Sequence, residues 1–248
     1  VTKQNSIDNF IKQTSLPIAN TNKGFSFEFS KDALANYDED TMTHDSLNQL
    51  LQLHKVGDSV VLHGQVTLKN SLFFIPALGA SANEKHMIEA WLFHLLQAAS
   101  GKLGITCILS KKDKQFTSFV PVSENAAKTQ LALWCACYAS VNVGMTPFIW
   151  HLEPAWQWLK LKRGAGEDKA HEYLDKYRAD IATDGTKDPY VARYFNEQVE
   201  FPANFEAMTE LLLGPIQEHI QTASASAQKD LASFFELYET TVDKEQGA

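Results

Sequence analysis

The sequence predicts an α/β fold with a mixed central sheet and flanking helices. Short runs rich in β-branched and aromatic residues alternate with longer segments of helical periodicity, which is the pattern of a layered α/β domain rather than of a helix bundle. Hydrophobic residues make up 44% of the 248 residues and aromatic residues 11%, which is ample for a packed core.

The sheet is predicted to contain a strand, a tight turn and a second strand. Residues 59–67 are rich in valine and leucine, and residues 71–75 form another apolar run that ends at Pro76. Lys69 and Asn70 between them are predicted to form the hairpin turn. A weaker strand is predicted upstream, where three phenylalanines alternate with polar residues: Phe25, Phe27 and Phe29.

A helix is predicted after the hairpin. Ser81 or Asn83 is expected to cap it, and Gly101 is expected to end it. Its apolar residues recur at helical spacing and are Met87, Ile88, Trp91, Leu92, Leu95 and Leu96. Two further strands are predicted at 105–109 and 116–120, on either side of a basic loop.

The C-terminal half is predicted to be mainly helical. Ser123 is expected to cap a helix that runs to about residue 143, and a strand is predicted at 145–151. Later helices are predicted over about 167–181, 189–197 and 204–241, with a break between the C-terminal helices at the low-complexity stretch near 223–227.

The order strand, turn, strand, helix is the layout in which many DNA nucleases hold a catalytic metal ion. Such a site needs a carboxylate on the first strand and a carboxylate and a lysine on the second, to hold Mg²⁺ and activate water. The first strand has Thr67 here, and the second has Ile75, Pro76, Ala77 and Leu78. No catalytic residue and no metal ligand is therefore predicted. No nucleotide-binding or other cofactor motif is found either, so no cofactor is expected.

Two other functions stay open from the residues alone. A degenerate but active metal-dependent DNA nuclease would have to recruit Glu84 or Glu89, the nearest acids, which lie on the following helix. The second alternative is a protein-interaction module without DNA contact.

Two stretches carry side chains that suit nucleic acid. The first is the basic loop, where three lysines are positioned to touch phosphates: Lys111, Lys112 and Lys114. The second interleaves aromatic and basic residues, as sequence-tolerant single-strand grooves do, and comprises Trp156, Trp158, Lys160, Lys162 and Arg163. An ordinary explanation competes with this one, because tryptophans two residues apart can belong to a core and lysines cover most protein surfaces.

The net charge and the cysteine content bear on DNA binding and on the cellular compartment. The formal net charge of −8 weakens the case for free-standing DNA binding but leaves room for a local basic strip. Three cysteines in so long a chain argue against a disulfide framework and for the cytoplasm. Cys135 and Cys137 are interpreted as core thiols, because no second Cys/His pair stands at zinc-ligand spacing.

No apolar run reaches the roughly 18–20 residues of a membrane span, so no membrane contact is expected.

Four stretches resemble one known family. They are HGQVTLKNSLFFIPALGASANEKHMIEAWLFHLLQAASG, PFIWHLEPAWQWLK, YLDKYRA and KDPYVARYF. Their order and spacing are similar to those of the C-terminal domain of RecC, the gamma chain of exodeoxyribonuclease V, over about residues 57–220.

The resemblance implies a restriction-endonuclease-like core of the PD-(D/E)XK type, related to the nuclease domain of the partner RecB but without its catalytic residues. It also implies a place in the RecBCD complex, with RecB-type and RecD-type subunits and forked or single-stranded DNA as partners. On this interpretation residues 1–55 are an N-terminal covering segment, residues 56–152 the nuclease-like core, and residues 153–248 a mainly helical extension. The predicted function is subunit assembly and DNA handling in double-strand break repair, so the chain is not expected to be an enzyme by itself.

Overall fold

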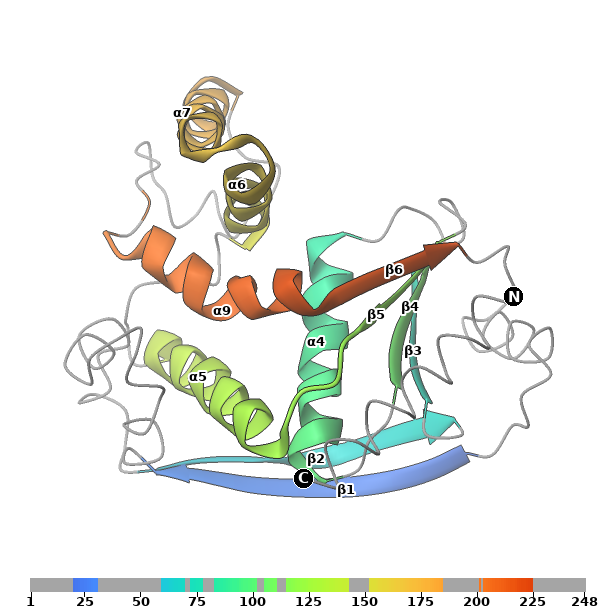
Figure 1. Ribbon diagram of the computed structural model, residues 1–248. Helices are drawn as coiled ribbons and strands as arrows, with labels where there is room; N and C mark the ends of the chain where they lie inside the picture. The colour runs from blue at the N-terminus through green and yellow to red at the C-terminus, as the bar shows by residue number, and fades with distance from the viewer. Residues whose placement is uncertain are drawn as a thin grey trace. The chain divides into compact units, whose positions relative to one another are not determined.

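Eleven helices and strands are seen in the part of the chain that the computed structural model describes, which is residues 20–30, 59–69, 72–77, 83–101, 105–110, 115–142, 152–184, 201 and 203–224 (Figure 1). They follow in the order β1 (Asn20–Ser30), β2 (Ser59–Lys69), β3 (Leu72–Ala77), α4 (Glu84–Ala99), β4 (Ile105–Ser110), β5 (Gln115–Phe119), α5 (Glu124–Asn142), α6 (Leu152–Ala165), α7 (Glu167–Asp184), α9 (Phe205–His219) and β6 (Ile220–Ser224).

The strands form one mixed sheet in the order β1-β2-β3-β4-β5-β6. β1 and β2 pair antiparallel over their whole length, from Asn20 with Lys69 to Ser30 with Ser59. β2 then meets β3 at a single described pair, Lys69 with Leu72. β3 and β4 are parallel, whereas β4 with β5 and β5 with β6 are antiparallel.

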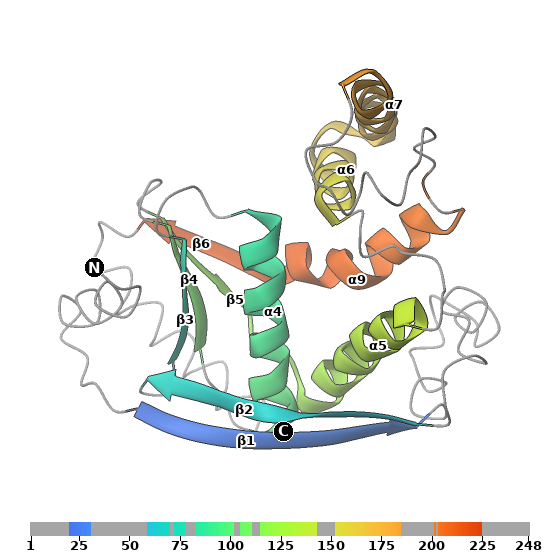
Figure 2. The same cartoon turned by 180° about the vertical axis from the view of Figure 1, so that it is seen from behind.

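Helix α4 supplies the crossover that the parallel pair β3 and β4 requires. It lies along one face of these strands (Figures 1 and 2). At its start, the Asn83 side chain accepts a hydrogen bond from the amide of His86 at 3.3 Å, and the Asn83 amide donates to Nδ1 of His86 at 3.3 Å. This capping box satisfies amide groups that have no partner within the helix. At its end, Gly101 takes a φ of 61°, a left-handed conformation that favours glycine.

An aromatic cluster joins α4 to β5. The Trp91 ring lies with its centroid 5.3 Å from that of Phe119 and 5.7 Å from that of His94. Trp91 and Phe119 have no exposed surface. A second link is polar and buried, because Gln97 Nε2 of α4 donates to Thr106 Oγ1 of β4 at 2.9 Å. These contacts fix the helix on the sheet.

The described residues fall into two compact units. The first unit holds the six strands, α4 and the first part of α5. The second holds α6, α7, residues 136–142 of α5 and residues 205–217 of α9. In the second unit Gly166, with a φ of 98°, ends α6 and starts α7. Its amide donates to the carbonyl of Leu161 at 3.1 Å, and its carbonyl accepts from the amide of Ala170 at 3.3 Å.

Most predicted elements inside the described residues are confirmed. The strands expected at 59–67, 71–75, 105–109 and 116–120 correspond to β2, β3, β4 and β5, and the strand with the three phenylalanines corresponds to β1. Asn83 rather than Ser81 caps α4. The helices expected from Ser123 and over 167–181 are α5 and α7.

One predicted helix is wrong in its extent. The helix expected from about residue 204 to the break near 223–227 ends at His219, and Ile220–Ser224 form the strand β6 against β5. The part expected beyond residue 224 lies outside the described residues. The physical reason is that β5 has an edge whose amide and carbonyl groups need partners, and the residues 220–224 supply them.

Other expectations are not tested. The strand at 145–151 and the helix at 189–197 lie outside the described residues. The restriction-endonuclease-like core and the divisions after residues 55 and 152 stay predictions. In the described ranges there is no helix with the length and apolar character needed to cross a membrane.

Candidate nucleic-acid interface

The lysine-rich loop joins two paired strand ends. Lys111, Lys112 and Lys114 themselves lie outside the described residues. Ser110, the last residue of β4, pairs with Gln115, the first residue of β5, in an antiparallel ladder. Four residues therefore connect two adjacent partners, as in a β-hairpin. The two strands predicted on either side of the basic loop are confirmed as an antiparallel pair, and the contact of the loop with phosphates stays a prediction.

The two tryptophans of the second stretch are core residues of α6. Trp156 is 9% exposed and Trp158 is 0% exposed. The Trp158 ring meets that of Phe205 edge to face, with centroids 6.3 Å apart. Lys162 Nζ lies 4.7 Å from the centroid of the Trp158 ring. A base stacks only on a ring with an accessible face, so neither tryptophan offers a stacking surface in the described structure.

Two of the three basic residues of this stretch are engaged inside the second unit. Lys162 Nζ lies 3.1 Å from a carboxylate oxygen of Glu210. The Arg163 guanidinium contacts the same carboxylate at 3.4 Å and donates to the carbonyl of Gly214 at 3.2 Å. A Cβ at residue 214 would lie 3.1 Å from the guanidinium, so the glycine makes room for it. Lys160 is exposed and takes part in none of these contacts.

The strands on which a nuclease would hold its metal carry no acid at the expected places. Thr67 lies on β2, and Ile75, Pro76 and Ala77 lie on β3, while Leu78 falls outside the described residues. These are apolar or hydroxyl side chains, which do not hold a divalent cation.

The two acids that an active nuclease would recruit lie on α4. Glu84 is 8% exposed and Glu89 is exposed. Five residues on a helix correspond to a rotation of about 140° between them. In the described part of the chain neither carboxylate belongs to a group of three potential metal ligands.

The histidines of α4 have structural partners. His86 belongs to the capping box. His94 Nε2 lies 3.1 Å from the carbonyl oxygen of Val120, and because a carbonyl only accepts, Nε2 carries the proton. Burial lowers the pKa of His94 to about 4, so the ring is neutral at physiological pH. His86 therefore serves the N-terminal cap of α4, and His94 serves the packing of the helix in the core.

The three cysteines are free thiols. Cys107 and Cys137 are buried, and Cys135 is half-buried. Burial raises the pKa of Cys135 and of Cys137 to about 11. Since the thiolate is the nucleophile and the metal ligand, these protonated thiols fit the interpretation as core residues.

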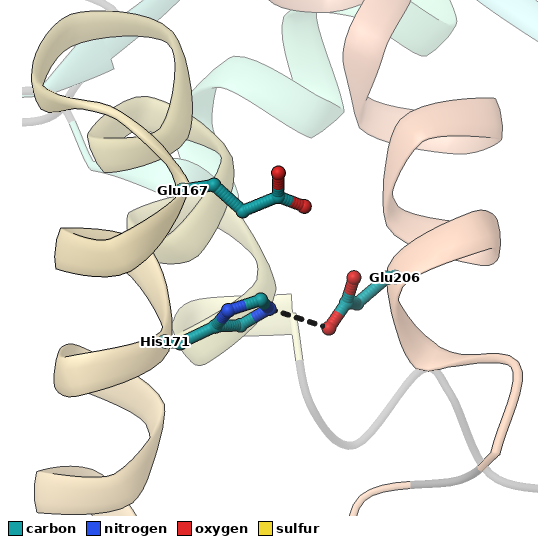
Figure 3. Close-up of side chains that lie close together, drawn as sticks. All are labelled: Glu167, His171 and Glu206. Atoms are coloured by element: carbon teal, nitrogen blue, oxygen red, sulfur yellow. Dashed lines mark hydrogen bonds and ion pairs between the residues drawn. The ribbon is translucent and has the colours of Figure 1, made fainter.

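One group of side chains was not singled out from the sequence. Glu167 and His171 on α7 and Glu206 on α9 point toward one another (Figure 3). His171 Nε2 lies 2.9 Å from a carboxylate oxygen of Glu206. The four-residue spacing of Glu167 and His171 on a predicted helix is a signal for two of the three. Glu206 arrives only through tertiary structure, so no local pattern indicates it.

Comparison with known proteins gives one match. A family model described as the RecC C-terminal domain matches residues 29–163, which is just over half of the chain. No curated protein and no solved structure matches it. The match begins in β1 and ends at the last residue of the tryptophan and lysine stretch of α6. The expected family is therefore confirmed, but the match starts earlier than residue 57 and ends well before residue 220. The stretches YLDKYRA and KDPYVARYF lie beyond it, so their resemblance stays a prediction.

Proposed function

This chain belongs to the family of RecC C-terminal domains, and on that premise we propose that it is a non-catalytic domain that serves subunit assembly and DNA handling. Membership of the family implies a domain of the RecC subunit, hence a part of the RecBCD complex and of DNA repair and recombination. The proposed partners are RecB-type and RecD-type subunits and forked or single-stranded DNA. The proposed place is the cytoplasm, where the three free cysteines would stay reduced.

The observation that carries the non-catalytic part is the composition of β2 and β3. We propose that the mixed sheet with its β3-α4-β4 crossover is a restriction-endonuclease-like core that has kept its frame and lost its carboxylates. Phosphodiester hydrolysis by a metal ion needs those carboxylates and a group that activates water. Thr67 on the first strand and Ile75 to Ala77 on the second supply neither.

Only a few basic side chains are left to contact DNA in the proposed function. The burial of Trp156 and Trp158 and the ion pairs of Lys162 and Arg163 leave Lys160 and the hairpin lysines as the candidates. Neutralising a few phosphates gives weak and salt-sensitive binding. The domain is therefore proposed to touch DNA within the assembled complex rather than to capture it alone.

The rival nuclease would depend on Glu84 or Glu89. Mg²⁺- or Mn²⁺-dependent cleavage of DNA by the chain, abolished by Glu84→Gln or Glu89→Gln, would favour it over the proposed function. The burial of Glu84 and the separation of the two acids around α4 weigh against it.

Co-purification tests the proposal. The tagged full chain, co-expressed with RecB-type and RecD-type subunits from the same source, is expected to retain at least one of them at stoichiometric level after nuclease treatment. The treatment removes DNA that could bridge the proteins. Loss of both subunits from a chain whose circular dichroism shows folded helices would contradict the assembly role.

A further inference from the structure

Three ligand-type side chains of the second unit converge on one point. Glu167 is the first residue of α7, His171 lies one turn later on the same face, and Glu206 stands in the first turn of α9. One ligand atom from each lies within 4.8 Å of those of the other two. In Figure 3 the imidazole and both carboxylates point into the space between the two helices. All three residues lie outside the matched range 29–163, so the family membership says nothing about them.

We propose that Glu167, His171 and Glu206 bind a divalent transition-metal ion of the zinc class. An imidazole nitrogen with two carboxylate oxygens is a donor set that Zn²⁺ accepts, whereas Mg²⁺ and Ca²⁺ prefer oxygen donors alone. Metal–ligand bonds of about 2.0–2.2 Å place neighbouring donors of a tetrahedral ion about 3.4 Å apart. His171 Nε2 and a Glu206 carboxylate oxygen now lie 2.9 Å apart as a hydrogen-bonded pair. A metal ion would take the place of the shared proton and open this pair to about 3.4 Å. The Glu167 side chain is 60% exposed, which leaves its carboxylate room to turn toward the same point.

The charges of the cluster favour a cation. Two carboxylates face one imidazole, which in its neutral form donates a single hydrogen bond on this side. Lys162 lies 4.0 Å from Glu167 but 3.1 Å from Glu210, and its ammonium sits over the Trp158 ring. A divalent ion would balance both carboxylates of the cluster at once.

A simpler role accounts for the acids one at a time. Glu167 and Glu206 each stand in the first turn of a helix, where the helix dipole favours a negative charge. That effect does not require side chains of two helices to converge on a histidine. The ion would tie α7 to α9, so part of its binding energy would stabilise the second unit, and its fourth position would be left to water.

Metal titration of the full chain tests the site. After treatment with a chelator, calorimetric titration with Zn²⁺ is expected to give one saturable site per chain. His171→Ala and Glu206→Gln are each expected to weaken the Zn²⁺ affinity at least about tenfold. Loss of a residue that only supports a metal ligand already costs about 10–100-fold, and these residues are proposed to be ligands. The matched control is Glu172→Gln, an exposed acid next to His171 that pairs with Lys169 and should leave the affinity within about twofold.

Cobalt distinguishes this site from a cysteine site. Co²⁺ in place of Zn²⁺ is expected to give a visible spectrum without a sulfur-to-metal charge-transfer band, and His171→Ala is expected to remove that spectrum. Absence of saturable binding, equal affinities in His171→Ala and Glu172→Gln, or a thiolate band would each overturn the proposal. Circular dichroism of the variants checks that the fold is kept.

Discussion

His94 packs against both Trp91 and Phe119 in the core of the first unit and donates to the carbonyl of Val120. A charged imidazolium at this place would lose its hydration without gaining an acid, which is why the pKa falls to about 4. The group therefore contributes packing and one hydrogen bond, and it does not exchange protons near neutral pH.

The lowered pKa of His94 predicts a loss of stability in mild acid. Between the unfolded value of 6.5 and the folded value of about 4, the unfolded chain binds a proton that the folded chain does not. The free energy of unfolding therefore falls as the pH drops through this window, by roughly 1 kcal/mol per pH unit from this residue. Urea unfolding at pH 7 and pH 5 measures this fall in the free energy of unfolding.

A non-titrating variant isolates this contribution. His94→Gln keeps an N–H donor for the carbonyl of Val120, and its free energy of unfolding is expected to fall less between pH 7 and pH 5 than that of the unmodified chain. All other groups titrate in both proteins and cancel in the comparison. The same pH dependence in both would show that His94 does not set it.

At the scale of elements, α6 separates its two faces sharply. Its buried side chains are Pro154, Ala155, Trp156, Trp158 and Leu159. Lys160 is exposed, two residues after a fully buried tryptophan. The aromatic residues of this stretch therefore belong to the core, whereas Lys160 belongs to the surface.

Two substitutions on α6 distinguish the core residue from the surface residue by their effects on stability. Trp158→Ala is expected to lower the free energy of unfolding by about 3–5 kcal/mol, because it leaves a cavity next to Phe205. Lys160→Ala is expected to change it by less than about 0.5 kcal/mol. Chemical denaturation compares the two variants. Similar small effects would mean that the tryptophan is not a core residue.

The elements also show what sequence can predict. α4, α5 and α7 were predictable because apolar residues recur at helical spacing and because Asn83, Gly101 and Ser123 are typical of helix ends. β6 was not, because IQTAS carries little local preference and becomes a strand only by pairing with β5. The same limit applies to the three-ligand cluster, whose Glu206 is placed by packing and not by spacing.

For the whole molecule, the relevant fact is a basic loop on a chain of net charge −8. Long-range attraction to DNA is weak for such a chain, so local contacts must carry any binding. The sequence that joins β4 to β5 contains three lysines within four residues.

Charge reversal of the hairpin tests this. Changing Lys111, Lys112 and Lys114 to Glu is expected to weaken binding of forked DNA by the assembled complex at least about tenfold, and to reduce the salt dependence by about one phosphate contact per residue. Fluorescence anisotropy at several salt concentrations measures both quantities.

The matched control changes the same charge elsewhere. Lys85, Lys169 and Lys176 are exposed on α4 and α7, and their triple change to Glu is expected to have a much smaller effect. Unchanged DNA binding after charge reversal of Lys111, Lys112 and Lys114 would favour the protein-interaction module without DNA contact, and equal losses in the two triple variants would contradict a specific role of the loop.

The position of β6 in the chain has a consequence for synthesis. β5 ends at Phe119, and its partner β6 begins at Ile220, so the ribosome adds about a hundred residues before the partner exists. During that interval one edge of the nascent sheet offers its amides and carbonyls to any other strand, which is a known route to aggregation. Shortened versions of the chain that stop before residue 220 would keep this edge permanently, so a shortened chain needs to extend through Ser224.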